Sequence, residues 1–176
     1  MEKIEKKQKG KQIQVKRITS FGMLIALAFI FSYVESILPF QLPVPGMKLG
    51  LANIVVVAAL YCWGEKEAFV LSAVRILLVS LTFGNMTALL YSFAGGILSF
   101  AMMVLIKKIK CFDIIGVSIA GGVFHNVGQI LVAIVMLETK TIVYYLPALV
   151  VSGTVTGTGI GIAGGELTKR LKKIIV

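Results

Sequence analysis

The sequence predicts an all-α integral membrane protein, folded as a compact bundle of six transmembrane helices with both termini in the cytoplasm. Of its 176 residues, 57% are hydrophobic and 15% are charged, and the mean hydropathy is +0.93. Soluble domains carry about 45–50% apolar and about 25% charged residues. The apolar residues fall in six runs, and basic residues gather between them. We expect a basic cytoplasmic tail over 1–17 and a single membrane domain over 18–176.

The six apolar runs differ in length. A membrane-spanning helix needs about 20 apolar residues, with a range of about 17–25. Two runs, at about 49–63 and 68–83, are shorter and either use flanking residues or stop short of crossing, with a tight hairpin between them at Gly64–Glu67. The other four runs are long enough to span, and lie at 18–38, 86–106, 114–137 and 142–164.

Basic residues predict the orientation of the bundle. With the N-terminus inside, fifteen of the eighteen Lys and Arg lie on the cytoplasmic side. Only Lys48 and Lys140 lie on the other side, and Arg75 lies within the third run. The positive-inside rule therefore places both termini in the cytoplasm. We interpret 1–17 as a disordered or interfacial tail attracted to anionic lipid, rather than as a nucleic-acid-binding arm.

The stretch from Pro43 to Asn53 separates the first two apolar runs and is predicted to face outside. Pro43, Pro45 and Gly46 disfavour a continuous helix, because proline lacks a backbone donor and restricts the residue before it. Two interpretations remain for this stretch. It is either a plain turn between helices or a loop that covers a ligand.

Small residues at four-residue spacing predict close helix packing. A face of this kind lets another backbone approach within the membrane. Gly22 and Ala26 form a short version near the cytoplasmic end of the first run. The last run carries the longer version, which consists of Gly153, Gly157, Gly161 and Gly165.

Polar side chains within the apolar runs are candidate site residues, because each costs free energy unless it is paired. Arg75 either forms a structural ion pair with Glu35 or contacts a ligand. Gln129 follows His125 by four residues and Asn126 by three, so the three side chains line neighbouring parts of one helical face. They either form hydrogen bonds in the packed interior or line a cavity.

Several of these residues together resemble the bacterial family labelled heptaprenyl diphosphate synthase component I, also called Gx transporter. The resemblance covers nearly all of the chain after residue 18, and rests on Pro45–Ile54, Arg75, Gly95–Gly96, His125–Gln129 and Tyr145–Pro147. This family is similar to the substrate-binding (S) subunits of energy-coupling-factor vitamin transporters. The resemblance implies a multi-pass protein of the bacterial plasma membrane that holds a ligand under outer loops. It also implies that Gly22 and Ala26 dock a membrane coupling subunit that works with ATPases, with Gly22 replacing the usual alanine.

Two functions are therefore considered. The first is a substrate-binding subunit of a small-molecule importer, in which Lys48 and Arg75 supply positive charge for an anionic ligand. An isoprenoid or quinone-related ligand is suggested only by the family label. The second is a non-catalytic membrane anchor or regulator of a soluble prenyltransferase. The predicted ligand-binding residues are Glu35, Lys48, Asn53, Arg75, Asn85, His125, Asn126 and Gln129.

The composition argues against catalysis by this chain. Prenyl diphosphate synthases hold Mg²⁺ through Asp-rich clusters, because hard cations need several oxygen ligands. Here Asp113 is the one aspartate, and the seven glutamates are scattered. One histidine and two distant cysteines, Cys62 and Cys111, make no metal framework, and no Gly-rich nucleotide loop is present. We expect no enzyme activity, no metal or other cofactor, and no nucleic-acid partner.

Overall fold

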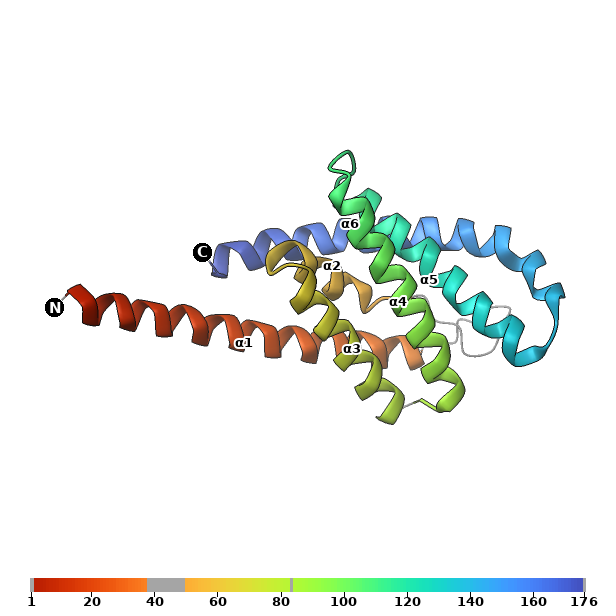
Figure 1. Cartoon of the computed structure of the whole chain (residues 1–176), viewed down its shortest axis with the longest axis horizontal. Coiled ribbons are helices and arrows are strands. Elements are labelled where there is room, and N and C mark those ends of the chain that lie inside the picture. Colours follow the sequence, from red (N-terminus) through yellow and green to blue (C-terminus); the bar gives the residue numbers. More distant parts are fainter. Residues whose placement is uncertain (1, 38–49, 83, 176) are drawn as a thin grey trace.

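The computed structural model describes the backbone of residues 2–37, 50–82 and 84–175. Within that part of the chain it contains six α-helices, one short 3₁₀ helix and no strand (Figure 1). The all-α prediction is confirmed there. The elements are α1 (Glu2–Ile37), α2 (Asn53–Cys62), α3 (Glu65–Thr82), α4 (Met86–Lys108), α5 (Ile114–Leu137), η1 (Lys140–Tyr145) and α6 (Leu146–Ile175).

Four stretches of the described chain are long and apolar enough to cross a membrane, so this is a membrane protein. They are 14–37 in α1, 86–108 in α4, 114–137 in α5 and 140–173 in η1 and α6. The predicted count of six spans is not confirmed. With ten residues, α2 is about 15 Å long, about half the thickness of the hydrocarbon core. The eighteen residues of α3 include four charged side chains.

The basic N-terminal segment is helical and continuous with the first span. No proline interrupts residues 2–37, so the helix that begins at Glu2 runs through to Ile37. Its N-terminal part extends beyond the other helices (Figure 1). The segment expected as a disordered or interfacial tail is therefore helical in the structure, because the helix favoured by the apolar run continues through the basic residues. Its interfacial location stays a prediction.

Both ends of the chain lie at the same end of the molecule (Figure 1). Two ion pairs gather the basic segments there. Arg17 on α1 pairs with Glu67, and the Lys108 Nζ atom on α4 lies 3.6 Å from a Glu65 carboxylate oxygen. This grouping is what a positive-inside arrangement requires. The cytoplasmic location of this end stays a prediction.

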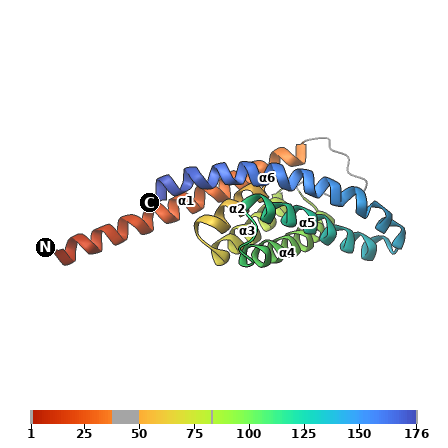
Figure 2. The ribbon, with the colours of Figure 1, turned by 90° about the horizontal axis from the view of Figure 1, so that it is seen from above.

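The short helix α2 lies at the centre of the bundle. Residues 55–60 of this helix are at most 1% exposed, because α1, α3 and α6 pack around it. Figure 2 shows α1 and α6 along one side of the molecule, with α2 between them and α3 and α4. At its C-terminal end, the Lys107 Nζ atom donates a hydrogen bond to the Leu60 carbonyl at 2.7 Å. The same ammonium lies 5.0 Å from the centre of the Tyr61 ring.

The predicted packing glycines of α6 lie against α5. A Cβ atom on Gly157 would lie 2.7 Å from the Ile119 Cα atom, which is closer than real Cβ atoms come. The glycines therefore allow the two backbones to touch. Gly153 and Gly161 behave similarly, with Cβ positions 2.9 Å from Gly122 O and 2.7 Å from Ile115 Cα. At Gly165 the contact is looser, because a Cβ atom would lie 3.3 Å from the side-chain Cγ2 atom of Ile114.

Candidate functional site

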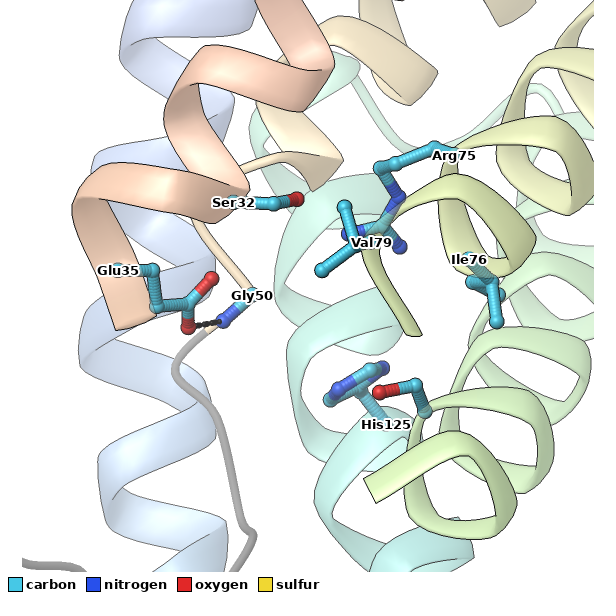
Figure 3. A pocket seen from close by; sticks show the side chains of 8 residues that line it. Ser32, Glu35, Gly50, Arg75, Ile76, Val79 and His125 are labelled. Atoms are coloured by element: carbon cyan, nitrogen blue, oxygen red, sulfur yellow. Dashed lines mark hydrogen bonds between the residues drawn. The ribbon is translucent and has the colours of Figure 1, made fainter. Parts of the chain in front are cut away.

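A buried polar pocket forms where α1, the turn before α2, α3, α4 and α5 meet (Figure 3). Glu35 comes from the last turns of α1, Arg75 from the middle of α3 and His125 from the middle of α5. All three are at most 9% exposed. The other described residues that line it are Ser32, Gly50, Ile76, Val79 and Ser92.

The turn before α2 brings a backbone donor into this pocket. Gly50 has a φ of +83°, a left-handed conformation that favours glycine. A Cβ atom there would also lie 2.9 Å from the Asn53 side chain. In this conformation the Gly50 carbonyl accepts from the Asn53 N–H at 2.8 Å, and the Gly50 N–H donates to a Glu35 carboxylate oxygen at 2.5 Å (Figure 3). The positive end of α2 thus lies next to a carboxylate.

Arg75 is buried with part of its hydrogen-bonding capacity unused. One of its terminal nitrogens donates to the Asn53 side-chain oxygen over 3.4 Å, a long distance for such a bond. Among the described residues, the Nε atom of Arg75 has no hydrogen-bond partner. Glu35 interacts with the guanidinium electrostatically and is turned towards Gly50 (Figure 3). A buried guanidinium needs such compensation, because desolvating a charge is costly.

His125 and Gln129 are in contact, as their four-residue spacing predicts. The His125 Nε2 atom lies 3.2 Å from the Gln129 amide nitrogen, and Gln129 is completely buried. Gly95 on α4 provides the room for the ring, since a Cβ atom there would lie 3.0 Å from the His125 Cε1 atom. Gly95 therefore helps to position the histidine, whereas Gly96 lies against Ile76.

The pocket is small. The centres of water-sized molecules have about 20 Å³ available within it, which is room for about one water. Any larger ligand therefore requires side chains to move. Over the described ranges, no three His, Cys, Asp or Glu side chains gather closely enough to hold a metal ion.

Most of the chain matches the sequence model of a known family. A sequence model of the family described as heptaprenyl diphosphate synthase component I matches residues 24–167. The chain belongs to this family. No curated protein and no solved structure matches the chain. The range shared with the heptaprenyl diphosphate synthase component I family includes all the described residues that line the pocket, and it confirms the family resemblance seen in the sequence.

The fold brings together some of the predicted site residues of this family member and separates others. Asn85 is exposed and caps the N-terminus of α4, where its side chain accepts from the Ala88 N–H at 2.8 Å. Asn126 is turned towards α6, and its side-chain nitrogen donates to the Leu149 carbonyl at 2.8 Å. Neither residue lines the pocket. Lys48, like Pro43–Leu49 as a whole, lies outside the described residues.

Five described lining residues were not among those predicted: the apolar Ile76 and Val79, which follow Arg75 on α3, and Ser32, Gly50 and Ser92. Ser32 lies one turn before Glu35, so the three-residue spacing within an apolar run was a usable signal. Gly50 stands in the stretch that carries the family resemblance, but its role depends on its φ angle. Ser92 had no signal of its own, because a serine in a membrane helix can satisfy its hydroxyl within the helix.

The predicted docking residues are on the surface. Gly22 is exposed, and a Cβ atom there would meet nothing within 4 Å. Ala26 is also exposed and lines an apolar groove of about 380 Å³ between α1 and α6. This face of α1 is therefore not used for packing within the described chain.

Proposed function

We propose that this member of the heptaprenyl diphosphate synthase component I family is a substrate-binding subunit of an energy-coupling-factor-type importer in the bacterial plasma membrane. The observation that supports this best is the buried pocket, where Glu35, Arg75 and His125 converge at the start of α2. Ionisable groups within membrane proteins are costly and commonly mark ligand or ion paths. Short helices whose N-termini point at such groups are a recurring feature of secondary-transporter binding sites.

The ligand in this proposal carries an anionic group that Arg75 binds. A guanidinium with unused donors suits a carboxylate or a phosphate. The family label suggests an isoprenoid or quinone-related molecule, and a pocket with about 20 Å³ available suits only the head of such a molecule. The chain binds and does not catalyse in this proposal, in keeping with its single aspartate.

The exposed small-residue face of α1 supports a membrane partner. Gly22 and Ala26 leave the backbone accessible, and close backbone approach is how small residues promote helix association in lipid. The resemblance to S subunits makes the partner a membrane coupling protein that works with ATPases.

Co-purification tests this function. The tagged full chain is extracted from its native membranes in mild detergent, and bound proteins are identified by mass spectrometry. We expect a membrane coupling protein and ATPases with the wild type, and their loss with Gly22→Leu. The matched control is Gly159→Leu, which also changes an exposed glycine with nothing near its Cβ position and should keep the partners. A wild-type preparation that contains neither type of partner would contradict the proposal.

The family description favours one second candidate, a non-catalytic anchor or regulator of a soluble prenyltransferase. The label names one component of a synthase, which implies another subunit. The basic N-terminal part of α1, which extends beyond the bundle (Figure 1), is a surface that such a subunit could contact. In the same co-purification, recovery of a soluble helical enzyme in place of ATPases would support this candidate.

A further inference from the structure

The start of α2 and Arg75 together have the chemistry of an anion-binding site. The N-terminus of a helix carries a partial positive charge, and α2 has ten residues. The N–H groups of Asn53, Ile54 and Val55 already donate to backbone carbonyls, so the backbone donor offered to the pocket is the Gly50 N–H. Arg75 lies beside this helix start, with its Nη2 atom 3.4 Å from Asn53. Its side chain is 93% buried, since 7% is exposed, and its Nε atom has no hydrogen-bond partner in the described part of the chain.

The anion that lies at this site in the structure belongs to the protein itself. The carboxylate of Glu35 accepts the Gly50 N–H at 2.5 Å (Figure 3) and interacts electrostatically with Arg75. It is 9% exposed and lines the same pocket as Arg75. A carboxylate tethered to α1 thus holds the position that an anionic ligand would take.

We propose that Glu35 is a built-in substitute for the ligand's anionic group, and that a carboxylate or phosphate of the ligand displaces it from Gly50. This inference rests on the proposed substrate-binding function and names the chemical class of the ligand. It also explains the size of the pocket. The space available now suits about one water, and withdrawal of the Glu35 carboxylate vacates room for a group of the same kind.

In this proposal the Glu35 carboxylate competes with the ligand for the same position. Removing its charge should therefore change the affinity for the anion in a known direction. A ligand that must first displace a bound group has an apparent affinity reduced by the fraction of protein in the open state. Neutralising Glu35 should therefore strengthen anion binding. If Glu35 instead held a ligand amine or only positioned Arg75, the same change would weaken binding or leave it unaltered.

The test measures binding of acetate and of inorganic phosphate to the detergent-purified full chain, at constant ionic strength set with sodium chloride. Glu35→Gln keeps the size of the side chain and removes its charge. We expect it to lower the apparent Kd of the anion that binds by about tenfold, equivalent to about 1.4 kcal/mol. Arg75→Gln should weaken binding by at least about tenfold. The control Glu138→Gln removes an exposed charge at the end of α5 and should leave Kd unchanged.

The response of the two probes identifies the ligand group. A gain with acetate alone indicates a carboxylate site, and a gain with phosphate alone indicates a phosphate site. If Glu35→Gln does not fold, Glu35→Asp serves as the second variant, because its shorter side chain reaches Gly50 less well and should also tighten binding.

An apparent Kd that rises or stays the same when Glu35 is neutralised would overturn the proposal, as would a lack of response to both probes in every variant. Neither result would decide the proposed import function, which the co-purification of coupling proteins tests separately.

Discussion

Substituting two glycines of α6 that are two residues apart should have opposite effects on stability. Gly157 faces α5, where an added Cβ atom would lie 2.7 Å from the Ile119 Cα atom and 2.8 Å from the Ser118 carbonyl oxygen. Both are backbone atoms, so relief requires α5 and α6 to move apart. Gly159 is exposed, and a Cβ atom there would meet nothing within 4 Å.

The expected changes in the free energy of unfolding combine the cost of overpacking with the gain in helix propensity. Overpacking a well-packed interface costs about 1–3 kcal/mol, whereas replacing glycine by alanine within a helix gains about 0.8–1.0 kcal/mol. Gly159→Ala should therefore stabilise the protein by up to about 1 kcal/mol. In Gly157→Ala the gain offsets only part of the clash, which leaves a net loss of up to about 2 kcal/mol.

Thermal unfolding in detergent, followed by helical circular dichroism, measures the difference. By the relation for domains of this size, 1 kcal/mol shifts the midpoint by about 2–4 °C. The midpoint of Gly159→Ala should lie above that of the wild type, and the midpoint of Gly157→Ala should lie below it. A Gly157→Ala variant as stable as Gly159→Ala would refute the close contact between α5 and α6.

Three further changes test the roles that the structure assigns to polar side chains. Asn85→Ala removes the cap of α4 and should lower the free energy of unfolding by about 1 kcal/mol, with anion binding unaltered in the same titration. Asn126→Ala removes the hydrogen bond to Leu149 and should cost about 0.5–1.5 kcal/mol, again without changing the Kd, which a loss of binding would contradict. Lys107→Met removes the charged donor to Leu60 and should cost about 1–2 kcal/mol by thermal unfolding, and an unchanged midpoint would count against that contact.

The fold class could be predicted from composition and from the apolar runs, because helices that are buried in lipid require a high apolar content and long apolar stretches. The number of spans could not. The run at 49–63 looks continuous in hydropathy, but the positive φ of Gly50 starts the helix only at Asn53, which leaves α2 half the length of a span. Local conformation of this kind is set by what surrounds the turn, including the Glu35 carboxylate from another helix.

The site was predictable only in part for a similar reason. Helical spacing places His125, Asn126 and Gln129 near one another, and His125 and Gln129 do touch. Asn126 lies about 100° around the helix from His125, and the Leu149 carbonyl, 23 residues away in sequence, decides where its side chain points. In the same way, small residues at four-residue spacing look alike at Gly22 and in α6, although only those in α6 meet a neighbouring helix in the described structure.

Both the proposed function and the proposed displacement of Glu35 require that this chain binds a small molecule through Arg75. The most direct measurement is to purify the wild type and Arg75→Gln from native membranes in mild detergent and to identify the small molecules that each retains by mass spectrometry. We expect the wild-type protein to retain an anionic molecule in about equimolar amount, and Arg75→Gln to lose it while circular dichroism shows an intact fold. No retained molecule in the wild type, together with equal binding of added anions by both proteins, would contradict it.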